Sequence, residues 1–124
     1  MTEEPQPALD SSWRPLPRPG CVNVESRVLL VREGVGLAML RFEPAGTIDE
    51  HAAGHDVDVV CLEGEGYISV EDRVNSFAAG QWMTWPAGRL HRLWTADHGM
   101  VTLMVERLQH RSRTPGRPAR GTAR

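Results

Sequence analysis

The central part of the chain alternates short apolar runs with clusters of turn-forming residues. Several runs are β-branched or alternate between apolar and polar positions, which is typical of strands with one buried face. Turn signals such as Glu63-Gly64-Glu65-Gly66, Glu71-Asp72-Arg73 and Pro86-Ala87-Gly88 separate them, at a spacing of about ten residues. The predicted strands are residues 26–31, 36–42, 57–62, 67–70, 82–85, 90–94 and 100–106. No segment repeats its apolar positions with the period of a helix, so the pattern predicts an all-β sandwich or barrel.

Prolines mark the two ends of the chain. Seven of the nine prolines lie outside residues 20–108, five before them and two after. Proline has no N–H to give to a strand ladder, so both ends are predicted to be flexible or extended. The predicted organisation is a Pro-rich flexible N-terminal arm at 1–19, a β-barrel domain at 20–108 and an Arg-rich disordered tail at 109–124.

Composition excludes several kinds of chemistry. The chain of 124 residues has no lysine, and all 14 of its basic residues are arginine, so Schiff-base catalysis and a P-loop lysine are excluded. Cys21 and Cys61 form no Cys-x-x-Cys pair and are expected to be reduced. No run approaches the ~20 apolar residues of a membrane span, and the first 19 residues do not resemble a signal peptide. We therefore expect a cytoplasmic protein with no membrane partner.

Charge is distributed unevenly along the chain. Residues 20–109 contain 13 acids and seven arginines, a balance of −6, whereas residues 110–124 contain five arginines and no acid. An arginine cluster can neutralise phosphates, but this tail has no aromatic residue to stack on bases, and the domain itself is acidic. We expect a solvated tail and no nucleic-acid partner.

Four residues in the second half of the domain have a specific spacing. Gly80, Pro86, Gly88 and His91 follow the pattern G-x5-P-x-G-x2-H, and Thr95 replaces the asparagine that would complete it. Pro-x-Gly makes a tight reversal because proline restricts φ and glycine supplies a positive φ, so the histidine begins the next strand. This segment resembles the second motif of the cupin superfamily. The resemblance implies a double-stranded β-helix, the jelly-roll barrel of small single-domain cupins, with a histidine-based site inside.

The first cupin motif is only partly present. Gly46 and His51 match its glycine and its first histidine, with one residue fewer between them, and Leu62-Glu63-Gly64-Glu65-Gly66 matches the family's hairpin. Counting back from this hairpin by the family's spacing places Ala53 at the second histidine and Val57 at the glutamate. Two of the family's four usual metal ligands are therefore missing.

Nearby residues offer replacements for the missing ligands. His55 shares the inward parity of His51 if the segment from 51 to 57 stays extended, and Asp56 adds a carboxylate. The string from His51 to Asp56 also resembles a branch of small stand-alone cupins that reads H-x-x-P-x-D. The candidate metal ligands are His51, His55 and His91, with Asp56 as a fourth ligand or as a residue that orients one. Three imidazoles and a carboxylate suit Fe(II), Mn(II), Ni(II), Cu(II) or Zn(II).

Two functions are open at this point. The protein could be a metal-dependent oxygenase, isomerase or lyase that acts on a small organic molecule. Alternatively, the same histidines could be polar groups of a metal-free pocket in a cupin that binds or senses a small molecule without catalysis. Val57, where the family has a carboxylate, argues against the metal. The resemblance also implies a homodimer that pairs through the N-terminal strand at residues 20–31.

Other side chains are assigned to structure. The tryptophans at 82, 85 and 94 are expected in the core or at its rim, with stacking on a ligand as the alternative. Cys61 lies in the middle of a strand and is expected to act as a small buried hydrophobe, with a reactive thiol as the alternative. Tyr67 is expected to pack on the hairpin, and His98 to face solvent in a loop.

Overall fold

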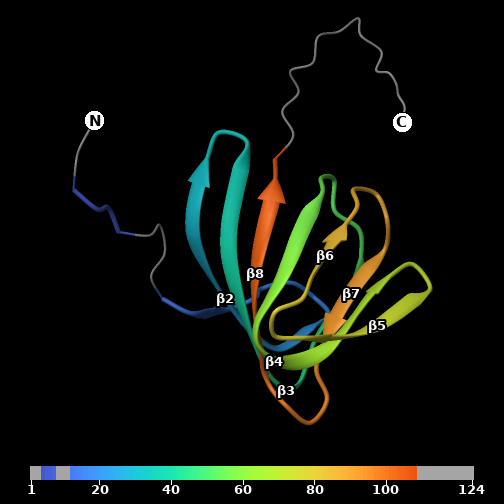
Figure 1. Ribbon diagram of the computed structural model, residues 1–124. Helices are drawn as coiled ribbons and strands as arrows, with labels where there is room; N and C mark the ends of the chain where they lie inside the picture. Colours follow the sequence, from blue (N-terminus) through green and yellow to red (C-terminus); the bar gives the residue numbers. More distant parts are fainter. Residues whose placement is uncertain (1–3, 8–11, 109–124) are drawn as a thin grey trace, which may run out of the picture.

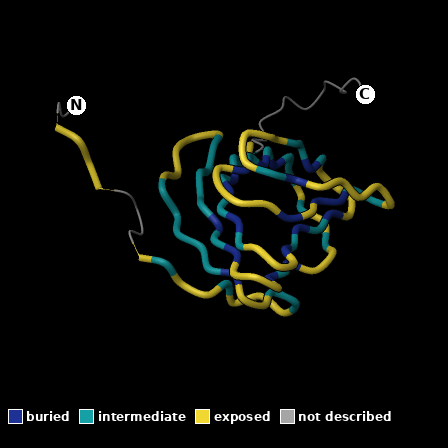
Figure 2. The backbone as a smooth tube through the Cα atoms, turned by 60° about the horizontal axis from the view of Figure 1, so that its bottom comes forward, coloured by how far each residue is buried: buried dark blue, intermediate teal, exposed yellow. Residues whose placement is uncertain are grey.

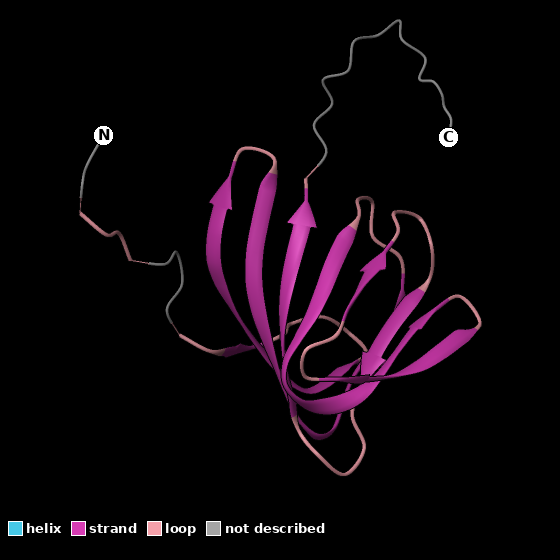
Figure 3. Cartoon of the chain, viewed as in Figure 1, coloured by secondary structure: helices cyan, strands magenta, loops and turns pink. Residues whose placement is uncertain are grey.

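The protein is built from strands. A computed structural model describes residues 4–7 and 12–108, and every regular element in these residues is a β-strand (Figure 1, Figure 3). The strands are β1 (Arg14–Pro15), β2 (Cys21–Arg32), β3 (Val35–His51), β4 (Val57–Val70), β5 (Arg73–Ala78), β6 (Trp82–Trp85), β7 (His91–Trp94) and β8 (Met100–Arg107). The all-β prediction is confirmed. The described part of the chain contains no helix that could span a membrane.

Strands β3 and β4 run through both layers of the molecule. The first part of β3 pairs with β8, and its last part pairs with β7. The first part of β4 pairs with β6 and β8, and its last part pairs with β5 and β7. All these pairs are antiparallel. Because two long strands bend from one layer into the other, the sheet curls into a jelly-roll barrel, and its strands fan out from the bend (Figure 1).

The core lies between the two layers. Along β4, Val57, Val59 and Cys61 are buried, whereas Asp58 between them is partly exposed. This alternation is expected for a strand with one face inside, and Figure 2 shows buried stretches within the barrel and exposed turns around it. The buried apolar side chains are Val24, Leu40, Phe42, Ile48, Val57, Val59, Cys61, Ile68, Phe77, Trp85, Leu93, Met100 and Met104.

Strand β4 is longer than the sequence pattern predicts. The turn predicted at 63–66 is a bend within β4, because Glu63 and Gly64 stay paired with β8 while Glu65 and Gly66 pair with β5. Gly64 has a φ of 77°, and a β-carbon at this position would collide with the carbonyl of Gly99. The prediction of a turn was wrong here because glycine lets the strand bend without ending.

Part of the predicted N-terminal arm lies against the barrel. Strand β1 pairs with β2, and Leu16 packs against the core. The guanidinium carbon of Arg41 lies 4.2 Å from the ring centroid of Trp13, which is a cation–π contact. This stretch is extended, as proline-rich backbone favours. The predicted tail at 109–124 and residues 1–3 and 8–11 of the arm lie outside the described residues.

Strand β2 lies near one end of the strand order, next to the two residues of β1. Its side chains Val22, Leu30 and Val31 are exposed. The homodimer through residues 20–31 stays a prediction.

Candidate functional site

The fold brings His51 and His91 together. His51 is the last residue of β3 and His91 the first residue of β7, and the two are register partners in the pairing of these strands. Their Nε2 atoms lie 3.2 Å apart, and their rings meet edge to face with centroids 4.4 Å apart. His91 is buried, whereas His51 is partly exposed. Two residues that are 40 positions apart in sequence thus form one imidazole pair where β3 ends and β7 begins.

The turn before β7 sets the position of His91. Gly88 has a φ of 78°, as the Pro-x-Gly pattern predicts. Two hydrogen bonds hold this turn against the segment that follows β3: Gly88 N donates to Ala53 O at 2.9 Å, and Ala87 N donates to Asp56 Oδ1 at 2.8 Å. These bonds connect the turn of the second motif to the segment that follows His51 of the first motif. The turn thereby places His91 on the inner face of β7.

Trp85 packs against the pair from the opposite layer. This residue ends β6, and its ring is parallel to that of His91, with an interplanar angle of 2° and centroids 3.8 Å apart. It also meets His51 edge to face, at 6.2 Å between centroids. The sequence placed Trp85 in the core or at its rim, with stacking on a ligand as the alternative; its burial confirms the core, and its contact with His91 was not predicted. The alternation along β6 was the available signal, because it puts Met83 and Trp85 on the same inward face of the strand.

The hydrogen bonds of the pair assign its tautomers. His51 Nδ1 lies 2.9 Å from the carbonyl oxygen of Asp49, and a carbonyl only accepts, so His51 carries its proton on Nδ1. Its Nε2 is then an acceptor, and His91 donates to it from Nε2. With the proton on Nε2, Nδ1 of His91 is an acceptor, whereas the backbone hydrogen bond with Arg89 that raises the pKa of this ring favours a proton on Nδ1. Nδ1 is buried and makes no hydrogen bond of ordinary geometry, and the same holds for the indole N–H of Trp85.

The electrostatics of the pair favour a neutral His91. Burial, reinforced by the neighbouring His51 and by Arg18, lowers the pKa of His91 from 6.5 to about 4, and the backbone at Arg89 opposes this only in part. The imidazole of His91 is therefore uncharged at pH 7. Such a ring can accept or pass on a proton but does not attract an anion.

His55 lies apart from the pair. The chain leaves the extended conformation after His51, and residues 52–56 form a bend before β4 begins. The expected inward parity of His55 depended on an extended segment, and the bend removes it. His55 Nε2 instead lies 3.2 Å from Glu106 Oε1 on β8. Sequence reasoning did not single out Glu106, because nothing in the local pattern places β8 beside this bend.

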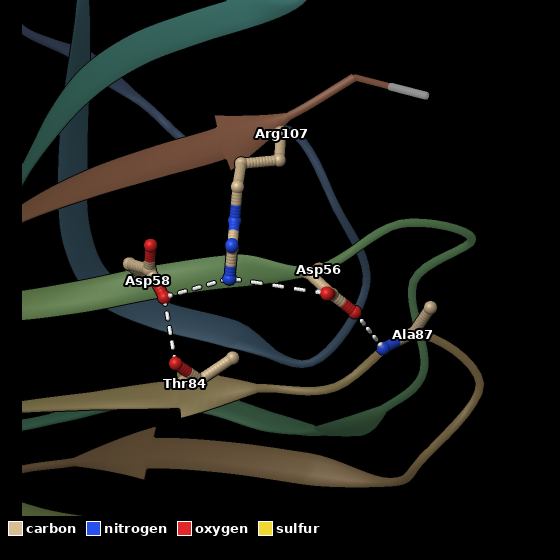
Figure 4. A network of polar contacts seen from close by, with 5 residues as sticks. All are labelled: Asp56, Asp58, Thr84, Ala87 and Arg107. Carbon is tan, nitrogen blue, oxygen red and sulfur yellow. Dashed lines mark hydrogen bonds and ion pairs between the residues drawn. The ribbon is translucent and has the colours of Figure 1, made fainter. Parts of the chain in front are cut away.

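Asp56 belongs to a polar network at the start of β4, shown in Figure 4. Besides its bond to the turn at Ala87, its Oδ2 lies 3.8 Å from Arg107 Nη2. The same nitrogen of Arg107 donates to Asp58 Oδ1 at 3.1 Å, and Thr84 Oγ1 donates to that oxygen at 2.6 Å. The carboxylate of Asp56 is thus used to hold the turn before His91 and to bind an arginine. The structure brings together two of the four predicted ligands, His51 and His91, and not the other two.

Comparison with known proteins identifies solved structures with the same architecture. No protein-family model matches the sequence, and no curated protein does. Solved structures do match. A cupin 2 conserved barrel domain protein from Rhodopseudomonas palustris superimposes with a TM-score of 0.73 over 80% of this chain and 72% of its own length, at 14% identity.

This chain has the cupin fold.

Two other cupin-fold neighbours have names that describe more than the fold. The polyketide cyclase RemF from Streptomyces resistomycificus matches with a TM-score of 0.73 at 19% identity, over 86% of this chain and 79% of its own. KdgF from a Halomonas species matches with a TM-score of 0.65 at 13% identity, over 79% of this chain and 87% of its own. At these identities the comparisons show the fold of this chain and not its activity.

The donor set of this chain does not fit the metal site that the fold family implies. The pair itself has suitable geometry, since two nitrogens bound to one ion at about 2.1 Å lie about 3 Å apart in neighbouring positions. However, catalytic metal sites use at least three protein ligands, and Ala53 and Val57 replace two of the family's four. Among the described residues, no group of three or more His, Cys, Asp or Glu is arranged to hold a metal ion. The metal stays a prediction that the described donors do not support.

The remaining residues singled out in the sequence lie away from the His51–His91 pair. Cys61 is buried, and burial raises the pKa of its thiol, which confirms a small buried hydrophobe. Tyr67 is exposed and stacks on Trp94, with ring centroids 5.7 Å apart. Trp82 lies exposed at the rim, and His98 is exposed in its loop as predicted.

Proposed function

We propose that this cupin binds a small, uncharged organic molecule through a hydroxyl-type group that contacts the Trp85–His91 stack. Four buried side-chain atoms of the described residues have no hydrogen-bond partner, and the observation that carries the proposal is that two of them, His91 Nδ1 and Trp85 Nε1, lie on one stack of rings. Buried polar atoms in folded proteins nearly always have a partner, so two on one stack point to a group that supplies their hydrogen bonds. Of the two functions open from the sequence, the metal-free one therefore has the stronger support.

The chemistry of the two atoms defines the ligand's group. The indole N–H of Trp85 can only donate, whereas Nδ1 of the neutral His91 accepts. A hydroxyl both accepts and donates, so a hydroxyl group has the chemistry to complement either atom. The low pKa of His91 keeps the ring uncharged at pH 7, so a carboxylate or phosphate gains no charge partner from it.

The comparisons are compatible with a site for a small molecule. The cupin fold is shared with a protein named as a polyketide cyclase, so this architecture is compatible with a site for an organic molecule. The interior His51–His91 pair is also a group through which a proton could move between a bound hydroxyl and the edge of the barrel, because Nε2 of His51 accepts from Nε2 of His91. Whether catalysis follows binding depends on the ligand.

The test compares three probes that differ in one group. Phenol, toluene and benzoate are titrated into isotope-labelled protein, and the imidazole nitrogens of His91 and the indole N–H of Trp85 are followed by NMR. We expect phenol to shift both signals, toluene to shift them less, and benzoate to leave them unchanged. Equal shifts with phenol and toluene, or no shift with phenol, would overturn the proposal.

Two variants and one measurement of metal complete the test. His91→Phe keeps a ring on Trp85 without its nitrogens and should lose the response to phenol, whereas His98→Phe changes an exposed histidine and should keep it. Elemental analysis of protein purified without chelators, and again after reconstitution with each candidate metal, tests the alternative. About one metal ion per chain in the wild type, lost in His51→Ala, would support the metal-dependent function instead.

A further inference from the structure

A groove opens on the side of the barrel between strands β5 and β6. It has a volume of about 460 Å³, which lies within the range of small-molecule pockets. In the described part of the chain, β5 pairs only with β4, and so does β6, so each of these strands leaves one edge unpaired. The groove therefore lies between two strands that are not hydrogen-bonded to each other.

The floor of the groove is apolar and its rim is aromatic. Ile68 and Phe77, which line it, are buried core residues, and Met83 is partly buried beside them. Trp82 stands at the rim with 66% of its surface exposed, more than any other large apolar side chain described. An indole with so much exposed surface gains free energy when another ring covers it.

The polar side chains of the groove are uncharged: two amides and the hydroxyl of Ser76. Asn75 comes from the β5 side, and Gln81 from the turn before β6. Gln81 Oε1 already accepts a hydrogen bond from Ala78 N at 2.9 Å, so the amide nitrogen is the group of Gln81 that can donate to a ligand. None of the seven residues that line the groove is charged.

Two other hollows of the molecule are lined by charged residues. One that lies over β7 is lined by Asp49, Glu50 and Arg92 among others, and one beside the loop before β8 by Glu65, Asp97 and His98 among others. A charged ligand would lose its hydration in the β5–β6 groove without meeting an opposite charge. The lining therefore selects for an uncharged ligand.

We propose that the β5–β6 groove binds an uncharged, planar aromatic group that stacks on Trp82 and bonds to the amides of Asn75 and Gln81. The proposal goes beyond the one for the histidine pair and does not depend on it, since the groove shares no residue with the Trp85–His91–His51 cluster. The two sites lie on adjacent inward positions of β6, at Met83 and Trp85.

The test uses 2-naphthol as the probe and naphthalene-2-sulfonate as its charged counterpart. Binding is measured by NMR from the backbone and side-chain amide signals, and the oligomeric state by sedimentation. We expect 2-naphthol to shift the side-chain amide signals of Asn75 and Gln81 and the indole signal of Trp82, and the sulfonate to bind at least about tenfold more weakly. Shifts confined to other parts of the barrel, or equal affinities, would overturn the proposal.

Matched variants separate the groove from its surroundings. Trp82→Ala removes the rim and should weaken 2-naphthol binding about tenfold, the scale of one aromatic contact. Asn75→Asp adds a charge with little change in size and should also weaken it, whereas Val74→Ala, at an exposed neighbour on β5 outside the groove, should not. Both test residues are exposed, so the variants are expected to fold.

Two outcomes distinguish a failure of the groove proposal from a failure of the proposed function. If His91→Phe leaves 2-naphthol binding unchanged while Trp82→Ala weakens it, the groove stands whatever happens to the proposed function. If Trp82→Ala changes the oligomeric state of the protein and leaves 2-naphthol binding unchanged, the exposed indole belongs to an interface between copies of the chain, and the ligand proposal is overturned.

Discussion

Lowering the pH from about 7 to about 4 is expected to destabilise the folded protein through His91. Burial, His51 and Arg18 lower the pKa of this imidazole from 6.5 to about 4. In the unfolded chain the ring titrates near its ordinary value, so between these two pH values the unfolded state binds about one proton more than the folded state. Stability therefore rises with pH across this window. It is lost as the pH falls from 6.5 to about 4, and below that both states are protonated.

The size of the effect follows from the two pKa values. A tenfold change in an equilibrium constant is about 1.4 kcal/mol, so a pKa lowered from 6.5 to about 4 corresponds to about 3 kcal/mol. His91 is only 1% exposed, so water screens the ring little. Because a small domain is stable by only about 5–15 kcal/mol, acidification removes a large part of the free energy of unfolding.

The assay is urea unfolding followed by circular dichroism at a series of pH values, on protein dialysed against a chelator. The reference is His91→Phe, which keeps a ring on Trp85 but does not titrate. Between pH values of about 7 and about 4, the wild type should lose about 3 kcal/mol more than this variant. Glu71, whose pKa is lowered mainly by a hydrogen bond from Leu90 N, loses its contribution as the pH falls below about 4.5, but it is present in both proteins and cancels.

The reasoning would be refuted by parallel pH profiles of the wild type and His91→Phe. NMR titration of the His91 ring gives an independent check on the wild type alone, and a midpoint near 6.5 instead of about 4 would show that burial does not control this group. His98→Phe, which changes an exposed histidine, serves as the control and should retain the wild-type difference.

Three further predictions concern residues that support the site. Asp56→Ala removes the acceptor for Ala87 N and should lower the free energy of unfolding by about 0.5–1.5 kcal/mol, whereas Asp56→Asn keeps an acceptor and should cost less; equal losses in urea unfolding would contradict the bond. Thr95→Val leaves a buried backbone N–H without its acceptor and should cost about 1–3 kcal/mol, with Thr95→Ser near wild type in the same assay. A thiol reagent should label the partly exposed Cys21 in the native protein and the buried Cys61 only after unfolding, and rapid labelling of both, read by mass spectrometry, would show that the core opens easily.

Much of the fold was predictable because it depends on local patterns. Alternation along β4 and the runs around β6, β7 and β8 placed strands where the structure has them. The pattern missed how far strands extend, since β4 bends at Gly64 where a turn was expected. A glycine with positive φ is compatible with a turn and with a bend, and only the pairing partners β8 and β5 decide between them.

The candidate site was predictable only in part, for a related reason. His91 followed from the Pro-x-Gly turn before it, whose geometry is local. His55 was placed by a parity argument that needs an extended chain, and the bend at 52–56 breaks that condition. Trp85 was assigned to the core without its partner, because stacking on His91 is a contact between two layers that the one-dimensional pattern does not contain.

By itself, the sequence determined that this protein is all β and that its turn at 86–88 delivers His91 into a barrel, and the resemblance to the first cupin motif implied that Val57 stands where the family has a carboxylate. These properties depend on residue type and on spacing along the chain. The tertiary structure alone decided that His51 meets His91, that Asp56 holds a turn, and that β5 and β6 leave a groove between them. Such contacts join residues that are far apart in sequence, and their geometry is set by how the two layers pack, because side chains at these ends of the strands have several partners within reach until the barrel closes.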